Sequence, residues 1–301
     1  MPNLPIAAAV FLEFSPTAVS MSVAAILLFL IAVWAAKTDI VQASGLDKIV
    51  VLSNLCFALS LAAFGAEHLA AAKFIQMGVP SYVPWHLFWA YFVGVALLAA
   101  SLSIATKIEV RWSGLLFGIM LFLFVAMLHI PRVYANPRDR IAWAVAVRDM
   151  SFAGGGWILA AGAMREDGKG KLIPVGRMLV GIAAIFYGVE TFLHPLGMPG
   201  VPLEKLMPAW IPARPLIGYL TAAILVGAGA AILLAKNTRM AATYLGTWIV
   251  LLVVFIYGPV LIAALADPST DVKVEGLNYF FDTLLFGGTI LALASATPRA
   301  D

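Results

Sequence analysis

The sequence has few charged residues. Only 12% of its 301 residues are Asp, Glu, Lys or Arg, whereas soluble domains carry about 25%. The hydrophobic fraction is 62% and the mean hydropathy is +0.97. This composition excludes a soluble globular protein and indicates a chain whose main partner is the lipid bilayer.

Cysteine is almost absent as well. Cys56 is the single one and lies in the middle of an apolar run, which excludes an internal disulfide and a CxxC redox centre. There is no Gly-rich phosphate loop, and the net charge of +3 comes from short loops rather than from a basic patch. We therefore expect no nucleic-acid partner. We also expect no cleavable signal peptide, because the N-terminus lacks a basic segment and the first apolar run is long enough to span a membrane.

Long apolar runs fill most of the chain. A helix needs about 20 residues to cross a hydrocarbon core of about 30 Å. The sequence predicts an all-α polytopic membrane protein of about nine transmembrane helices, one N-terminal helix followed by two parallel four-helix repeats. The predicted spans are 17–36, 49–72, 84–106, 113–131, 143–163, 175–196, 214–235, 241–265 and 276–296.

The two sets of four helices share short motifs in the same order. The Glu, ring and Asp positions recur at offsets of 123, 128 and 133 residues. We interpret the chain as a tandem duplication, and four spans per repeat make the two halves parallel rather than inverted. The expected units are an interfacial segment with the first helix (1–46), a first repeat (47–164), a cytoplasmic linker (165–174) and a second repeat (175–297). The matches are Phe64-Gly65-Ala66-Glu67 with Tyr187-Gly188-Val189-Glu190, Gly78-Val79-Pro80 with Gly200-Val201-Pro202, His129-Ile130-Pro131 with Tyr257-Gly258-Pro259, and Asp149 and Gly154-Gly155 with Asp282 and Gly287-Gly288.

The basic residues of the loops predict the orientation, since cytoplasmic loops carry an excess of Lys and Arg. Eleven lie on the side of the C-terminus and seven on the other. We expect an external N-terminus and a cytoplasmic C-terminus in a bacterial inner membrane. The eleven are Lys37, Lys48, Lys107, Arg111, Arg165, Lys169, Lys171, Arg177, Lys236, Arg239 and Arg299, and the seven are Lys73, Arg132, Arg138, Arg140, Lys205, Arg214 and Lys273.

Ionisable side chains within the spans gather toward the predicted outer ends of the helices. Such groups are costly in hydrocarbon and are candidates for function. We predict catalytic roles, as groups that move protons, for Glu67, His68 and His129. We predict ligand-binding roles for His86, Arg148, Asp149, Glu190, Tyr257 and Asp282.

Structural roles compete with these functional ones. Glu67 and His68 are adjacent and point about 100° apart on a helix, so they could instead cap the helix end near water. His86 follows Pro84 and Trp85, a pattern typical of an interfacial anchor.

Two further positions carry their own alternatives. His194 precedes Pro195 at a helix end, which also indicates the interface. Arg148 needs a partner in hydrocarbon, and Asp149, Glu67 or a ligand anion could serve.

The residue pattern does not identify a cofactor. Three histidines and a carboxylate could bind a transition metal, yet no His-x-x-His, His-x-x-x-His or Glu-x-x-His spacing places two ligands on one helix face. A haem would need axial ligands from facing helices. A quinone ring suits the aromatic residues near the same end, although membrane-interface belts have the same composition. The pattern thus favours a quinone over a metal or a haem. The aromatic residues are Phe64, Tyr82, Trp85, Trp89 and Tyr91.

The repeated unit resembles the DoxX and DoxX-like family of four-helix membrane proteins. Its marks are a span ending in Phe-Gly-x-Glu, a Gly-Val-Pro loop, a basic turn at Lys107 and again at Lys236 to Arg239, a third span ending in His or Tyr, and a fourth with Asp and Gly-Gly. The resemblance covers about residues 47–297, and the fused double unit departs from the single unit of the family. It implies a role in a membrane redox system, because the family takes its name from a subunit of a thiosulfate:quinone oxidoreductase. Other membrane or periplasmic redox subunits would then be partners.

Two functions stay open at this point. The first is a membrane oxidoreductase component that binds a quinone-like ring near the outer leaflet. The second is a non-catalytic module that binds or carries a hydrophobic solute or holds a partner complex together. For the first, we expect one cavity lined by Glu67, His68, His129, Arg148 and Asp149, with Arg148 paired to a carboxylate.

Overall fold

The computed structural model describes residues 15–164, 170–201 and 204–298. In these ranges the chain is helical apart from turns and one isolated β-bridge, between Gly197 and Leu206. Eight helices are long and apolar enough to cross a membrane, and α9 (Arg140–Gly162) is a ninth long helix. The predicted all-α polytopic fold is confirmed. Residues 1–14 of the predicted interfacial segment and residues 165–169 of the predicted linker lie outside the described residues.

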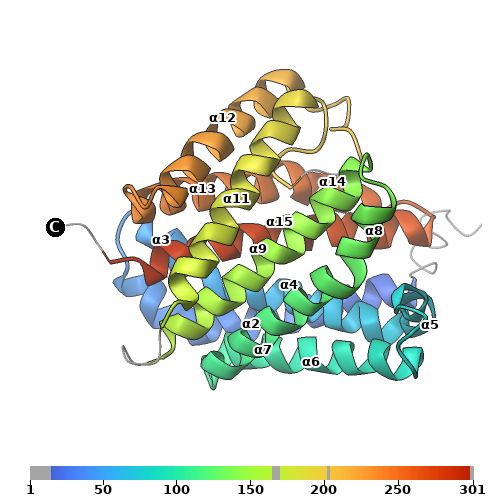
Figure 1. Ribbon diagram of the computed structural model, residues 1–301. Helices are drawn as coiled ribbons and strands as arrows, with labels where there is room; N and C mark the ends of the chain where they lie inside the picture. Colours follow the sequence, from blue (N-terminus) through green and yellow to red (C-terminus); the bar gives the residue numbers. More distant parts are fainter. Residues whose placement is uncertain (1–14, 165–169, 202–203, 299–301) are drawn as a thin grey trace, which may run out of the picture.

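The helices lie side by side in one bundle, with the C-terminus at one end and α5 and α8 toward the other (Figure 1). The first half contains α2 (Pro16–Gln42), α3 (Asp47–Val50), α4 (Ser53–Ala70), α5 (Ala72–Ile75), η1 (Gln76–Gly78), α6 (His86–Thr106), α7 (Val110–Phe124), η2 (Val125–His129), α8 (Ile130–Ala135) and α9. The second half contains α11 (Leu172–Leu193), α12 (Arg214–Leu233), α13 (Thr238–Leu252), η3 (Val253–Tyr257), α14 (Gly258–Leu265) and α15 (Thr270–Ala296).

Helices α9 and α15 pack against each other in the interior of the bundle. Each also contacts a helix of the other half, since α15 packs on α4 and α9 packs on α11. Glycine permits this approach: a Cβ on Gly155 of α9 would lie 2.5 Å from Thr289 Oγ1 and 2.9 Å from Phe57 Cζ. Small residues at such contacts let membrane helices approach closely. The two halves therefore meet along α4, α9, α11 and α15.

Unusual backbone conformations recur at a constant spacing. Non-glycine residues with positive φ are uncommon, yet six occur among the described residues, in three pairs separated by 128 residues. Two π-helices, η2 and η3, have the same separation. These recurrences support the proposal that the two halves arose by duplication. The three pairs are Trp85 and Ala213, Lys107 and Ala235, and Glu109 and Asn237.

A proline accounts for each π-helix. Pro131 and Pro259 lie two residues after the ends of η2 and η3. Proline has no N–H and its ring clashes with the carbonyl four residues earlier, so a regular α-helix cannot run through it unchanged. The wider π turn absorbs the misfit, and such turns are frequent at functional sites. Their last residues are His129 and Tyr257, two of the predicted site residues.

The halves differ in the loop that follows their first helix. In the second half the loop between α11 and α12 packs Met198, Val201 and Met207 into the core. In the first half the corresponding segment leaves Tyr82 and Trp85 exposed. The first half is thus the more open of the two on this side.

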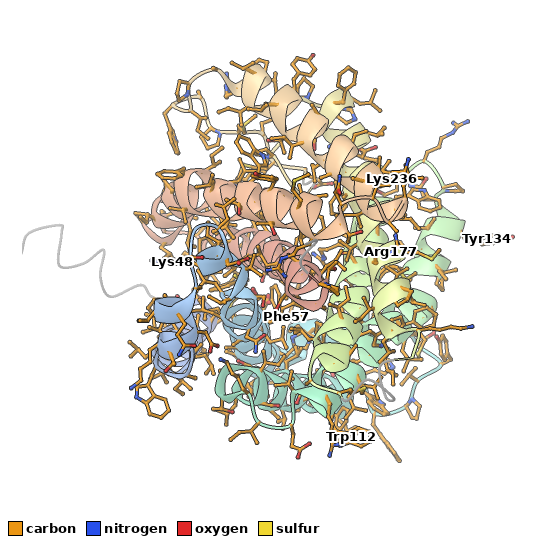
Figure 2. All side chains as sticks on the ribbon, turned by 90° about the vertical axis from the view of Figure 1, so that its left-hand side faces the viewer. Lys48, Phe57, Trp112, Tyr134, Arg177 and Lys236 are labelled. Atoms are coloured by element: carbon orange, nitrogen blue, oxygen red, sulfur yellow. The ribbon has the colours of Figure 1, made fainter. Side chains whose placement is uncertain are left out.

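Basic side chains lie at the end of the bundle near the C-terminus, opposite the end with these loops. Lys48, Arg177 and Lys236 are labelled on the end of the bundle that faces the viewer in Figure 2. Arg177 Nη1 donates to the carbonyl of Leu233 at 2.8 Å, which satisfies a free carbonyl at the end of α12. The loop charges predict that this end is cytoplasmic, and the orientation stays a prediction.

Candidate functional site

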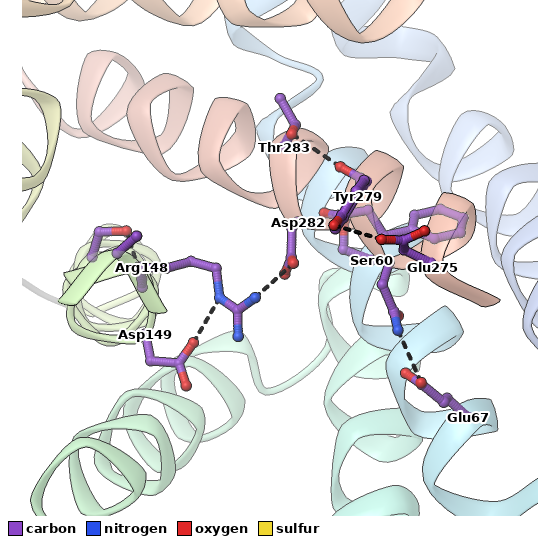
Figure 3. A network of polar contacts seen from close by, with 12 residues as sticks. Ser60, Glu67, Arg148, Asp149, Glu275, Tyr279, Asp282 and Thr283 are labelled. Carbon is purple, nitrogen blue, oxygen red and sulfur yellow. Dashed lines mark hydrogen bonds and ion pairs between the residues drawn. The ribbon is translucent and has the colours of Figure 1, made fainter. Parts of the chain in front are cut away.

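The buried charges form a chain of contacts between the two halves. Helix α9 begins after Asp139, whose Oδ1 accepts hydrogen bonds from the N–H groups of Ile141 and Ala142, both at 3.0 Å. Arg148 follows eight residues after the start of α9, about two turns into the helix. Its Nε lies 3.0 Å from Asp149 Oδ1 and its Nη1 lies 2.6 Å from Asp282 Oδ2 on α15 (Figure 3).

His129 extends this chain from the other side. Its Nε2 lies 2.8 Å from Asp149 Oδ2, so Asp149 contacts Arg148 through one oxygen and His129 through the other. The carboxylates of Asp149 and Asp282 are only 9% and 8% exposed. A buried ion is tolerated when it is paired and hydrogen-bonded. The expectation that Arg148 has a carboxylate partner is confirmed. Its second partner is Asp282, for which the sequence predicts a ligand-binding role and a correspondence to Asp149 but no contact with Arg148.

Glu67 and Glu190, which occupy matching motifs in the two halves of the sequence, each contact a helix of the other half. Asn278 Nδ2 on α15 donates to Glu67 Oε1 at 3.0 Å. Arg140 Nη1 on α9 donates to Glu190 Oε2 at 3.1 Å. The two contacts differ in charge, since Glu190 has a cationic partner and Glu67 has a neutral amide.

Asn278 and Arg140 had not been predicted as site residues. The signal that could have identified Asn278 is an amide inside an otherwise apolar span, since polar side chains in hydrocarbon need a partner. Arg140 had been counted only among the loop charges. Both residues connect the halves, as Arg148 does.

A cavity lies between α6 and α7, and His68 is on its wall. The cavity has a volume of about 750 Å³ and an almost entirely apolar lining. His68 Nδ1 lies 2.8 Å from the carbonyl oxygen of Phe64, one turn earlier on α4. No described residue is within hydrogen-bonding distance of His68 Nε2. Residues that line the cavity include Ile75, Val79, Trp89, Ala96, Trp112, Ser113, Met127 and Leu128.

The expectation of one cavity shared by five residues is wrong. Among Glu67, His68, His129, Arg148 and Asp149, only His68 lines the cavity between α6 and α7. The other four satisfy their polar groups with one another, with Asp282 or with Asn278. The physical reason is that an ion in an apolar interior is stabilised by a partner far more than by an open apolar space.

Tyr257 and His86, the remaining predicted site residues, do not line the cavity, and neither does His194. Tyr257 is buried, and its hydroxyl donates to the carbonyl of Pro199 at 2.9 Å. His86 is the first residue of α6, half-buried, next to the exposed Trp85. His194 is exposed and its Nε2 lies 4.0 Å from Glu190 Oε2. These positions agree with structural roles.

No group of three or more His, Cys, Asp or Glu residues that could hold a metal ion occurs in the part of the chain that the structure describes. No family model, curated protein or solved structure matches the chain. The cavity and the polar contacts are therefore the features that bear on function.

Proposed function

We propose that the protein is an integral membrane component of a redox system and binds an isoprenoid quinol in the cavity between α6 and α7. The observation that carries the proposal is the single imidazole in that cavity. His68 places a nitrogen without a protein partner on an apolar wall.

The hydrogen bond to Phe64 determines what His68 can offer a ligand. A carbonyl oxygen only accepts, so the proton of the contact is on Nδ1 of His68. An imidazolium among apolar side chains would need a carboxylate, and none in the described part of the chain lies within ion-pair distance of His68. The ring is then neutral and Nε2 is an acceptor. A quinol hydroxyl can donate to this nitrogen, whereas the carbonyls of an oxidised quinone cannot.

The shape of the cavity supports an elongated ligand. Its wall extends from Trp112 of α7 to Leu128 of η2, a distance of about 24 Å at 1.5 Å per residue. The volume lies within the roughly 300–1,000 Å³ that is usual for small-molecule sites. A hydroxylated ring beside His68 and an apolar tail along α6 and α7 would match both the polarity and the length.

The wider role rests on the sequence motifs and on the loop charges. The DoxX-like motifs favour a redox complex with other membrane or periplasmic subunits. We place the protein in a bacterial inner membrane, and the loop charges favour an orientation with the His68 end of the bundle toward the outside. In this proposal the ligand exchanges with the outer leaflet, and the electron donor is supplied by a partner.

The test is a binding titration of the purified protein in detergent, with a short-tailed ubiquinol kept reduced and with the corresponding ubiquinone. Tryptophan fluorescence can report binding, because Trp89 and Trp112 line the cavity. We expect saturable binding that is roughly three- to tenfold tighter for the quinol, the value of one hydrogen bond. His68→Phe should remove this preference, and His86→Phe, outside the cavity, should retain it.

Three results would contradict the proposal: no saturable binding of either form, equal affinities in the wild type, or a preference that survives in His68→Phe. Saturable binding of a hydroxyl-free apolar compound at the same affinity would favour the second function, a module that carries a hydrophobic solute.

A further inference from the structure

The cationic side chains between the two halves already form ion pairs with carboxylates other than Glu67. Arg148 contacts Asp149 and Asp282 through two of its nitrogens. His129 contacts the second oxygen of Asp149. The two carboxylates of Asp149 and Asp282 therefore already share the guanidinium of Arg148. An ionised Glu67 would add a negative charge with no cation to balance it.

Glu67 has a different environment from its counterpart Glu190. No Lys or Arg side chain in the described part of the chain lies within ion-pair distance of Glu67, and its hydrogen-bond donor is the neutral amide of Asn278. Glu190 is 3.1 Å from Arg140. A carboxylate in an apolar interior is costly without a cation. Glu190 has a cation beside it, and Glu67 does not.

The amide of Asn278 indicates how Glu67 avoids the cost of a buried, unpaired carboxylate. Asn278 Nδ2 donates to Glu67 Oε1, while Asn278 Oδ1 is buried and has no hydrogen-bond partner in the described structure. A buried acceptor left without a donor costs about 1–3 kcal/mol. A carboxylic acid presents an acceptor and an O–H donor at one end, as an amide does. A protonated Glu67 therefore has the donor that Asn278 Oδ1 lacks.

We propose that Glu67 is a proton-binding site and holds its proton in the resting protein, paired with Asn278. The carbonyl oxygen of the acid accepts from Nδ2, and its O–H group faces Oδ1. Glu67 immediately precedes His68 on α4, and His68 lines the cavity. A proton held by Glu67 is therefore close to the cavity. The proposal stands whether or not a quinol occupies that cavity.

The ionisable groups around Glu67 do not supply a compensating charge. Asp282 and, beyond it, Arg148 act on Glu67 through space, and their opposite charges oppose each other. Helix α2 contributes no ionisable residue between Pro16 and Ala36. The ionisable residues toward the same end of the neighbouring elements are His68 on α4, Lys73 on α5, His86 on α6, and Lys273, Glu275 and Tyr279 on α15.

Infrared spectroscopy of the purified protein at neutral pH tests the site. The spectrum of the wild type minus that of Glu67→Gln should show the carbonyl stretching band of a protonated carboxylic acid, shifted to lower frequency in D2O. Glu190→Gln is the matched control, and its difference spectrum should show the bands of an ionised carboxylate. A carboxylate signature for Glu67 as well would overturn the proposal.

A second variant covers the case in which Glu67→Gln does not fold. Asn278→Leu removes both the donor and the acceptor that face the acid. The protonated-acid band should then move to higher frequency, as expected for a carboxyl group that loses its hydrogen bonds. A wild-type spectrum without any such band, or one whose band does not move in Asn278→Leu, would contradict the proposal.

Discussion

Arg148 of the first half and Asp282 of the second half lie 2.6 Å apart, from Nη1 to Oδ2, and join the two halves inside the bundle. Arg148 on α9 and Asp282 on α15 can be buried because each supplies the opposite charge for the other. Arg148 has no cationic counterpart in the second half, where Phe281 precedes Asp282. The single guanidinium of Arg148 therefore pairs with an aspartate of each half.

Removal of Arg148 should be strongly destabilising. Arg148→Leu leaves Asp149 and Asp282 buried without their cation, and loss of one partner of a buried pair costs about 3–5 kcal/mol. The double variant Arg148→Leu with Asp282→Asn removes one stranded charge and should recover part of this loss. Thermal unfolding in detergent, followed by intrinsic fluorescence, measures both.

An exposed ion pair supplies the control for this experiment. Arg111 and Glu109 are 53% and 60% exposed, so Arg111→Leu should change stability by about 0–1 kcal/mol. A double variant less stable than Arg148→Leu would show that Asp282 does not depend on Arg148.

The contact between α9 and α15 should require glycine at residue 155. Gly155→Ala places a methyl group 2.5 Å from Thr289 Oγ1 and 2.9 Å from Phe57 Cζ, and overpacking of this kind costs about 1–3 kcal/mol. Gly162, near the end of the same helix, has nothing within 4 Å of an added Cβ. Gly162→Ala should therefore be neutral or slightly stabilising. Equal melting temperatures for the two variants would show that α9 and α15 are not in close contact.

The ring positions at the ends of the two π-helices should differ in their effects. Tyr257→Phe leaves the carbonyl of Pro199 without its donor, a loss of about 1–3 kcal/mol. It should not alter binding in the first-half cavity, because Tyr257 does not line it. His129→Phe removes a contact to the buried carboxylate of Asp149 and should destabilise the protein more. Melting curves and quinol titrations of both variants test this, and a larger loss in Tyr257→Phe would contradict it.

Hydropathy located the helices because each must cover a membrane thickness with apolar residues. The predicted span 84–106 is α6, His86–Thr106, and 214–235 is α12, Arg214–Leu233. The predicted span 49–72 contains a turn at Val51 and Leu52, between α3 and α4. Hydropathy does not predict this turn, because its residues are apolar. The π-helices were missed too, although Pro131 and Pro259 were visible in the sequence.

The partners of the polar residues were harder to predict than the helices. The sequence placed Arg148, Asp149 and Glu67 near one end of the bundle. It could not show which faces of α9 and α15 meet, and this alone brings Asp282 to Arg148 and Asn278 to Glu67. The cavity was also unpredictable, since its volume depends on how far α6 and α7 lie apart.

The loop charges predict a cytoplasmic C-terminus. Reporters fused after Asp301 test it: one that is active only in the cytoplasm should work, and one that is active only outside should not. The opposite pattern would reverse the orientation, and the Glu67 end of the bundle would then face the cytoplasm.

The account depends most on what the cavity between α6 and α7 holds. The direct measurement is mass spectrometry of the small molecules that co-purify with the protein from native membranes. Three proteins are compared: the wild type, Ala96→Phe, which places a phenyl ring in the cavity, and Val95→Phe, on the exposed side of the same helix. The account predicts a near-stoichiometric isoprenoid quinol or quinone in the wild type and Val95→Phe, and its loss in Ala96→Phe. The absence of quinone from all three, or equal amounts in all three, would contradict it.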